Sequence, residues 1–173
     1  MVKSVFHKKI AVTSSFGAES IVILHLVSKI DRNIPVIFLN TEKLFPETLH
    51  YLKIVKKKLN LNNIKIFKPN LEYLKKYDPK NNLYKSNPNL CCHIRKVLPL
   101  REAMKNYDAW INGRKRFHGS KRSNLKKIEI VNGLIKINPL ADWTFNKIKN
   151  YMITNNLPEH PLVAKGYLSL IHI

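Results

Sequence analysis

TSSFGAES, residues 13–20, is the stretch that decides the fold. An apolar run at residues 10–12 precedes it, and a helical pattern of apolar residues over residues 18–30 follows it. A strand, a tight turn rich in hydroxyl groups and a helix form a geometry that binds phosphate-like anions, because the first N–H groups and the dipole of the helix point at the anion. The stretch therefore predicts an anion-binding turn between a strand and a helix.

Four residues of this turn are candidates for contact with an anion. Gly17 lets the backbone bend towards it, and the hydroxyls of Ser14, Ser15 and Ser20 add hydrogen-bond donors. The alternative interpretation is an ordinary serine-rich turn with a serine capping the helix, because one glycine is a weaker signal than a full glycine-rich fingerprint.

Strands and helices alternate through the first seventy residues. Short apolar strands are expected at residues 10–12, 36–39 and 64–67, with helices at 18–30 and 46–59 between them. This alternation predicts an α/β fold with a parallel sheet and right-handed crossovers. Ligands of such sheets bind at the carboxyl ends of the strands.

The same rule places two separate stretches beside each other. The serine-rich turn follows the first strand, and Asn40 and Thr41 follow the second. Later elements are expected as a short helix at 71–77, a mobile polar loop up to about residue 89, a helix from 90 to 104, a strand at 108–111, a β-hairpin at 128–137 with an Asn132-Gly133 turn, and a last helix at 144–153.

Length and composition limit the class of protein. The 173 residues, 45% of them hydrophobic, are expected to form a single domain over residues 1–173 with a real core. No apolar stretch approaches the roughly 20 residues of a membrane span, and we expect no signal peptide and no membrane partner. Two neighbouring cysteines make no disulfide framework, which favours a cytoplasmic protein.

The net charge of +20 attracts anions. Many lysines, such as Lys53 and Lys56, fall on the solvent face of a predicted helix, so nucleic acid is not the expected partner. The basic run at residues 114–116 follows a predicted strand, and Arg122 is close to it in sequence. Arginine recognises phosphate or sulfate oxygens with two parallel donors, which makes this loop a second candidate for anion binding.

Cys91 and Cys92 are the two cysteines of the chain. Thiolates are ligands for zinc and for iron–sulfur clusters, and Arg95 and Lys96 would offset the charge of an anionic cluster. The alternative is a pair of buried cysteines that act as small hydrophobic residues.

Taken in order, these motifs resemble the adenylyl sulfate and phosphoadenylyl sulfate reductases. The resemblance covers residues 9–169 and rests on SSFGAES, LFPET, CCHIRKVLPL, GRKRFHGSKR, INPLADWT and HPLVAKGYLS. The cysteine pair is similar to the branch that uses adenylyl sulfate and carries a [4Fe-4S] cluster.

The resemblance implies a Rossmann-like sheet of the adenine-nucleotide α-hydrolase type, also called the PP-loop type, and the reduction of adenylyl sulfate to sulfite and AMP in sulfate assimilation, with thioredoxin as electron donor. For the substrate, it implies a phosphosulfate loop lined by Ser14, Ser15, Phe16, Gly17 and Ser20, further phosphosulfate contacts from Lys115, Arg116 and Arg122, and adenosine contacts from Leu39 and Thr41. For the cluster, it implies that Cys91 and Cys92 are two of the [4Fe-4S] ligands and that Lys96 has a supporting role between cluster and substrate. Whether the protein forms a homo-oligomer stays open.

The chain departs from the family pattern at residues 40–42, at its C-terminus, and at its N-terminus, where relatives usually carry a helical segment before the first strand. Asn40-Thr41-Glu42 stands where the family has Asp-Thr-Gly, which leaves the adenosine contacts there open. Residues 170–173 replace a second cysteine pair, with His172 at the position of its first cysteine, and the nucleophilic cysteine that follows in the family is absent. We therefore expect a family member that is incomplete at the C-terminus, and also at the N-terminus, and that is inactive alone; whether residues 170–173 are native is open.

Three other functions compete with this one. A PP-loop ATP pyrophosphatase or tRNA-thiolating enzyme would carry a Ser-Gly-Gly-x-Asp-Ser loop, against which Phe16 and Glu19 argue. A phosphoadenylyl sulfate reductase and a nucleotide-binding module without catalysis are the other two.

Overall fold

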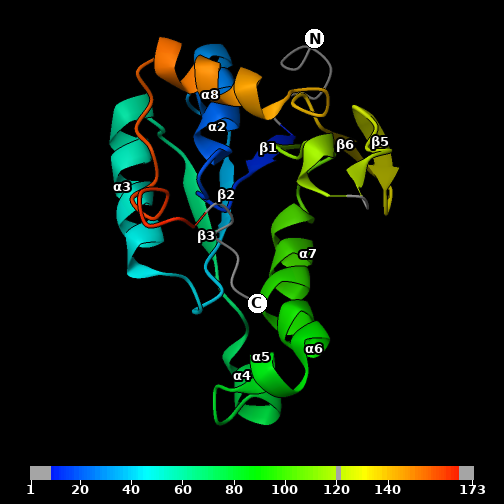
Figure 1. The fold of residues 1–173 in the computed structure, drawn as a ribbon. Coiled ribbons are helices and arrows are strands. Elements are labelled where there is room, and N and C mark those ends of the chain that lie inside the picture. Colours follow the sequence, from blue (N-terminus) through cyan, green and yellow to red (C-terminus); the bar gives the residue numbers. More distant parts are fainter. Residues whose placement is uncertain (1–8, 120–121, 168–173) are drawn as a thin grey trace.

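A six-stranded sheet forms the centre of the molecule in the computed structural model, which describes residues 9–119 and 122–167 (Figure 1). The strand order is β3-β2-β1-β4-β6-β5, and every pairing is parallel except that of β5 with β6. The strands are β1 (Ile10–Thr13), β2 (Val36–Leu39), β3 (Ile64–Phe67), β4 (Ala109–Asn112), β5 (Ile128–Val131) and β6 (Leu134–Ile137). The predicted α/β class and parallel sheet are confirmed.

The helices follow the predicted order with two short additions, and the helix expected at residues 90–104 is interrupted by a π-helical turn. They are α2 (Ser20–Ile30), α3 (Pro46–Leu59), α4 (Leu71–Tyr77), α5 (Leu83–Ser86), α6 (Pro88–Cys92), α7 (Leu98–Met104) and α8 (Phe145–Thr154), with a π-helical turn, η1 (His93–Val97), and a 3₁₀ turn, η2 (Arg116–His118). The short helix α5 lies where a mobile loop was expected, because the Asp78 carboxylate accepts a hydrogen bond from the Leu83 N–H and so fixes the start of the turn.

Two apolar layers hold the sheet between helices. On one face α2, α3 and α8 cover the strands, and Val12, Phe38 and Leu24 belong to this larger core. On the other face Ala103 and Met104 of α7 pack against Ala11 and Ile37. Because strand residues alternate between the two faces, neighbours such as Ala11 and Val12 enter different cores.

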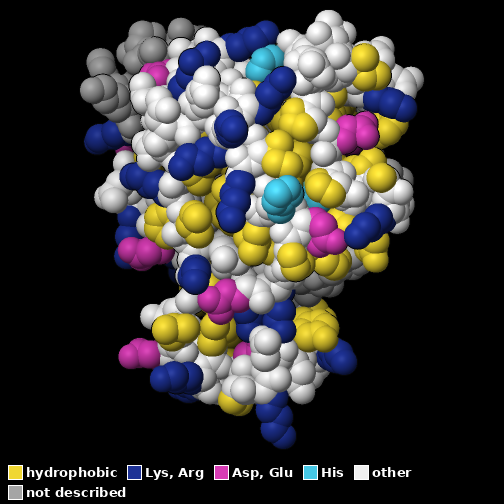
Figure 2. All heavy atoms as spheres, turned by 90° about the vertical axis from the view of Figure 1, so that its left-hand side faces the viewer, with side chains coloured by type: hydrophobic (Ala, Val, Ile, Leu, Met, Phe, Trp, Pro, Cys, Tyr) yellow, Lys and Arg dark blue, Asp and Glu magenta, His cyan; other side chains and the backbone are white. Residues whose placement is uncertain are grey.

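Helices α4, α5 and α6 form a small lobe below the sheet (Figure 1). The lobe has its own apolar cluster, which is made of Leu74, Leu83, Leu90, Cys91 and Ile94. A waist separates the lobe from the body in the view onto α3 (Figure 2). The lobe is therefore joined to the sheet mainly by α7 and by polar contacts described below.

The order of the strands creates a switch point between β1 and β4. The chain moves outwards from β1 through β2 to β3 and then returns to place β4 on the other side of β1. The helices and loops that follow β1 and β4 therefore diverge at their carboxyl ends, which is where open α/β sheets bind ligands.

Basic side chains on the α3 face are spread out rather than gathered in a stripe (Figure 2). The exposed lysines of α3 lie among neutral and apolar neighbours, which is the pattern of a solvated helix face. Across residues 9–119 and 122–167 we find no helix with both the length and the apolar character needed to cross a membrane.

Candidate anion site at the carboxyl ends of β1 and β4

The turn after β1 is organised by its own serine side chains. Ser14 is buried, and its Oγ accepts a 3.1 Å hydrogen bond from the Phe16 N–H. Ser20 Oγ donates a 2.6 Å hydrogen bond to the carbonyl oxygen of Gly17. Ser15 is exposed at the tip of the turn. Of the predicted hydroxyls, Ser15 is the one that faces solvent, whereas those of Ser14 and Ser20 shape the turn.

The bend in this turn lies one residue before the glycine. Phe16 has a φ of 52°, in the left-handed region, and Gly17 does not. The cost of this backbone is offset by burial, since the Phe16 ring is fully buried and meets the Phe38 ring edge-on at 5.3 Å. The left-handed residue of the turn is therefore Phe16 rather than Gly17, and Phe16 offers a ligand its backbone rather than its ring.

Helix α2 begins with an uncapped turn that points towards this edge. Glu19 holds the capping position, but no side chain caps the helix, and its first turn contains no acidic residue. The dipole of the eleven-residue helix therefore favours an anion at this end.

The loop after β4 meets this turn through an ion pair. Lys115 Nζ lies 2.5 Å from Glu19 Oε2, and His118 Nε2 lies 3.0 Å from the same oxygen. Lys115 is 4% exposed. Burial lowers the pKa of its ammonium group, Glu19 opposes that effect, and the charge of Arg122 adds to it. Lys115 was predicted to hold a ligand anion; in the structure its ammonium group pairs with Glu19, and its contact with an anion stays a prediction.

Arg116 also has partners within the chain. Its Nε donates a 2.9 Å hydrogen bond to the carbonyl oxygen of Leu125, and its Nη1 pairs with the carboxylate of Asp142. Asp142 pairs with Lys127 as well, at 2.7 Å. The contacts of Arg116 lead to the 125–142 region, so this guanidinium secures the loop after β4.

Two arginines remain available at this edge. Arg122 is half-buried and Arg114 is exposed. Burial lowers the pKa of the Arg122 guanidinium, and the neighbouring charge of Arg114 lowers it further. Among the ion pairs of the described residues, none joins either arginine to a carboxylate. Two neighbouring guanidinium groups without a carboxylate in ion-pair contact favour the binding of an anion between or beside them, although the Glu129 carboxylate interacts with Arg114 at longer range.

The loop after β2 borders the same edge of the sheet. Thr41 is 4% exposed; its Oγ1 accepts a hydrogen bond from the Lys43 N–H, and its carbonyl oxygen accepts one from Arg95. Asn40 Oδ1 accepts a 3.0 Å hydrogen bond from the Glu42 N–H, and Glu42 has a φ of 60°. Leu39 is half-buried at the end of β2. Leu39 can thus offer an apolar contact, while both oxygens of Thr41 are already engaged.

The two cysteines lie at the junction of α6 and the π-helical turn. Cys91 is fully buried and Cys92 is half-buried. Lys96 is half-buried as well, one helical turn after Cys92, so the two side chains share a face of the helix.

A metal centre at this position would have two thiols from the described residues, those of Cys91 and Cys92. Residues 9–119 and 122–167 contain no group of three or more Cys, His, Asp or Glu side chains that could hold a metal ion. The described residues do not provide the four ligands that a [4Fe-4S] cluster takes. His172, placed in the sequence where the family has a cysteine, lies outside the described residues.

A segment near the end of the described chain binds along α3. Tyr51 Oη donates to the carbonyl oxygen of Pro158 at 2.7 Å, and Lys165 pairs with Glu47 at 3.2 Å. The Phe45 and Tyr167 rings meet at 5.7 Å. Residues 157–167 therefore run from the middle of α3 to its N-terminus, beside the loop after β2 (Figure 1).

His160 fixes the middle of this segment. It is 1% exposed, its Nδ1 accepts a hydrogen bond from the Leu162 N–H, and its Nε2 lies 3.2 Å from Thr48 Oγ1. Since the Leu162 amide is a donor, Nδ1 is unprotonated and Nε2 carries the proton. Burial lowers the pKa of this imidazole, and Glu47 partly opposes the shift.

Sequence patterns missed Glu19, Asp78 and His160 as residues of this region. Glu19 is part of the quoted turn, and its charge beside a predicted anion site was the available signal. Asp78 gave no such signal, because its partner Arg95 is 17 residues away and the pairing depends on how the lobe folds.

Together the sheet order and the anion-directed edge define an α/β nucleotide-binding fold of the adenine-nucleotide α-hydrolase class. Yeast FAD synthetase in complex with FAD has the same fold, with a TM-score of 0.61 at 16% identity, over 95% of this chain and 56% of that one. The likeness at this identity concerns the fold alone.

The chain belongs to the family of phosphoadenosine phosphosulfate reductase domains, whose model matches residues 9–170. It is 47% identical over 168 residues to adenosine 5'-phosphosulfate reductase of Mesorhizobium japonicum, covering 97% of this chain and 66% of the relative. The crystal structure of phosphoadenylyl-sulfate reductase from Candida auris has a TM-score of 0.80 at 31% identity and covers 94% of this chain and 80% of that one. The chain thus spans about two thirds of the length of the curated relative.

Proposed function

We propose that this chain binds adenylyl sulfate as part of an adenylyl-sulfate reductase, which reduces it to sulfite and AMP. In this reaction the bond between the sulfate sulfur and the bridging phosphate oxygen breaks, AMP leaves with that oxygen, and two electrons reduce the sulfur to sulfite. Thioredoxin supplies the electrons as its dithiol becomes a disulfide. The support comes from the family of the chain and from relatives that carry the name adenosine 5'-phosphosulfate reductase.

The observation that carries the proposal is the pair Arg114 and Arg122. Both follow β4 at the switch point of the sheet, and neither is paired with a carboxylate among the described residues. A phosphosulfate group presents two adjacent anionic centres, which match two neighbouring guanidinium groups. The uncapped start of α2 and the exposed Ser15 hydroxyl add donors from the β1 side.

In this proposal the residues of the edge have different roles. Arg114, Arg122 and Ser15 bind the phosphosulfate, with Gly17 providing close access to the backbone of the turn. Lys115 and His118 hold Glu19 and so connect the two loops. Leu39 and the backbone of Thr41 border the adenosine.

The cysteine pair has a separate place in the proposal. Cys91 and Cys92 are two candidate ligands of the [4Fe-4S] cluster that the family resemblance implies, and Lys96 shares a helix face with Cys92. The remaining ligands would come from outside the described residues. The binding of adenylyl sulfate is therefore argued from the arginines alone.

Calorimetric titration with adenylyl sulfate and AMP tests the site. Arg122→Ala should weaken adenylyl sulfate binding by roughly 10- to 100-fold, since a hydrogen bond to a charged group contributes roughly 1.5–3 kcal/mol. Arg101→Ala is the matched control, because it removes the same charge from an exposed position on α7, and its affinity should stay within about threefold of the original. Equal losses in both variants would contradict the assignment.

Two further measurements separate the alternatives. Phosphoadenylyl sulfate differs from adenylyl sulfate by a 3'-phosphate, so a tenfold preference for it would favour the phosphoadenylyl branch of the family. Sulfite release that depends on reduced thioredoxin tests the reaction itself.

A further inference from the structure

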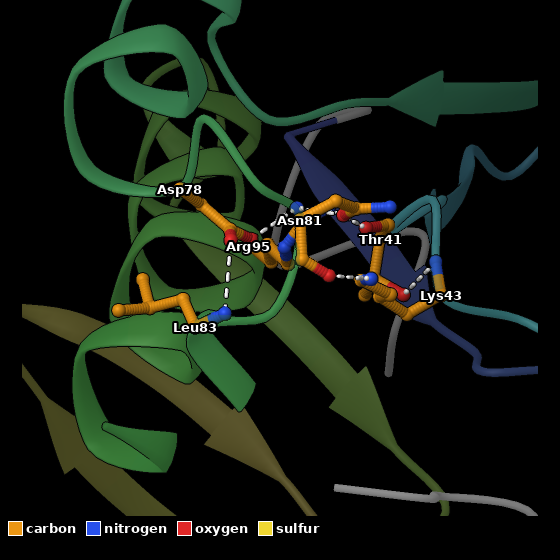
Figure 3. Close-up of polar contacts among 6 residues, drawn as sticks. All are labelled: Thr41, Lys43, Asp78, Asn81, Leu83 and Arg95. Atoms are coloured by element: carbon orange, nitrogen blue, oxygen red, sulfur yellow. Dashed lines mark hydrogen bonds and ion pairs between the residues drawn. The ribbon is translucent and has the colours of Figure 1, made fainter. Parts of the chain in front are cut away.

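Arg95 reaches from the cysteine-bearing helix to two other parts of the chain (Figure 3). Its Nη1 donates a 2.8 Å hydrogen bond to the carbonyl oxygen of Thr41, in the loop after β2. Its Nη2 donates to Asp78 Oδ2 at 2.7 Å and to Asn81 Oδ1 at 2.9 Å, both in the small lobe. The Arg95 side chain is 3% exposed, so these bonds form in a site from which water is largely excluded.

A second set of contacts closes the same network. Asp78 Oδ1 accepts a 2.9 Å hydrogen bond from the Leu83 N–H, and Lys43 Nζ donates to the carbonyl oxygen of Asn81 at 2.7 Å (Figure 3). Burial raises the pKa of Asp78, but its bonds to Arg95 and Leu83 lower it more, and the net pKa lies below the usual range. The carboxylate is thus charged and matched to the guanidinium.

Polar contacts carry the connection between lobe and loop, because apolar packing does not reach across. The apolar cluster of the lobe consists of residues from α4, α5, α6 and the π-helical turn, and none of them comes from the loop after β2. Between the lobe and the β2 loop lies a hollow of about 430 Å³, lined in part by Glu42, Lys75 and Arg95. A contact across this hollow therefore depends on Arg95 and Lys43.

We propose that Arg95 is a positioning residue that couples the nucleotide edge of the sheet to the cysteine-bearing helix. A ligand that orders the loop at residues 40–43 fixes the carbonyl of Thr41, and through Arg95 it also orders the lobe and the turn that carries Cys92 and Lys96. The planar guanidinium serves three acceptors at fixed angles, so a shift of one of them is passed to the others. The identity of the ligand rests on the proposed function, whereas the mechanical link does not.

Hydrogen–deuterium exchange measured by mass spectrometry tests the link in the free protein and with AMP. In Arg95→Gln we expect roughly tenfold or faster exchange in two separate segments, residues 40–45 and residues 71–92, because each loses a bond to a charged donor. Arg95→Lys keeps the charge but cannot serve three acceptors at once, so it should loosen both segments to a smaller degree. This variant also serves if Arg95→Gln fails to fold.

Leu74→Ala is the matched control, because the Leu74 side chain borders the same hollow and packs against the apolar cluster of the lobe but has no polar atom in the network. It should speed exchange at residues 71–92 and leave residues 40–45 unchanged. Faster exchange at residues 40–45 in Leu74→Ala, or unchanged exchange there in Arg95→Gln, would overturn the proposal.

Exchange measured with and without AMP distinguishes the proposed coupling from a purely structural role of Arg95. In the original chain AMP should slow exchange at both segments, and in Arg95→Gln it should slow exchange only at residues 40–45. Protection of both segments in Arg95→Gln would refute the coupling. Absence of any protection by AMP in the original chain would count against the proposed function, while the ligand-free comparison would still decide the role of Arg95.

Discussion

Glu19 Oε2 lies 2.5 Å from Lys115 Nζ, so the turn after β1 and the loop after β4 are joined by an ion pair at the centre of the candidate anion site. The carboxylate also lies 3.0 Å from His118 Nε2. A negative charge is thus already present where an anion is expected to bind. It pairs with Lys115, whereas Arg114 and Arg122 form no ion pair with a carboxylate among the described residues.

Glu19→Gln should lower the free energy of unfolding by roughly 2–4 kcal/mol, because it leaves the buried Lys115 ammonium without its partner. This loss is smaller than the full cost of breaking a buried ion pair, because Glu19 keeps some contact with solvent. Sulfate should restore more stability to this variant than to the original chain, because it can take the place of the lost carboxylate. Urea unfolding with and without sulfate measures both effects. Glu42→Gln, which affects an exposed pair with Lys68, is the control and should change stability by less than about 1 kcal/mol. Equal effects of the two substitutions would show that the Glu19 pair is not buried as described.

Gly113→Ala should destabilise the protein by roughly 1–3 kcal/mol, since the added Cβ would lie 3.0 Å from Cγ2 of Ile23 in α2. The contact would push the first turns of α2 away from the end of β4. Gly17→Ala is a matched control, because its Cβ would meet Ser15 Oγ at an ordinary 3.4 Å. Thermal unfolding of the two variants should differ accordingly, and a larger loss in Gly17→Ala would contradict this account.

Cys92 should react with iodoacetamide at least about ten times faster than Cys91 in the folded chain after treatment with a chelator, because Cys91 is fully buried and becomes accessible only through local opening. Fragmentation in the mass spectrometer separates the two neighbouring sites. In urea both thiols should react at similar rates. Faster labelling of Cys91 under native conditions would refute the orientation of this helix.

The stability of the protein should fall as the pH drops below about 6.5, because the buried His160 imidazole resists protonation. Its pKa in the folded state is lowered, so between that value and about 6.5 the unfolded chain binds more protons than the folded chain, and acid favours unfolding in that window. Above about 6.5 this contribution is constant. Urea midpoints between pH 5 and 8 measure the effect.

His160→Gln provides the comparison for this pH dependence. Glutamine keeps a donor and an acceptor but does not titrate, so the variant should lose part of the dependence of stability on pH below about 6.5. The pKa of His25 is also lowered by burial, but His25 contributes equally to both proteins. An unchanged slope would assign the acid sensitivity to groups other than His160.

The order of the elements was predictable from the sequence, and so was the edge of the sheet at which we propose the ligand binds. Short apolar runs at β2 and β3 and the Asn132-Gly133 turn are local signals, because side-chain alternation and turn geometry act within a few residues. Parallel strands follow from helices between strands, and their carboxyl ends then share one edge.

The tertiary structure decided which partner each charged side chain at that edge has. Lys115 and Arg116 are neighbours of similar charge in the sequence, yet one pairs with Glu19, 96 residues away, and the other with Asp142. The burial of Arg95 likewise depends on Thr41 and Asp78, which come from separate elements. A sequence determines where charges stand along the chain, but the cost of burying them is set by the partners and solvent around them, and only the folded chain brings those partners together.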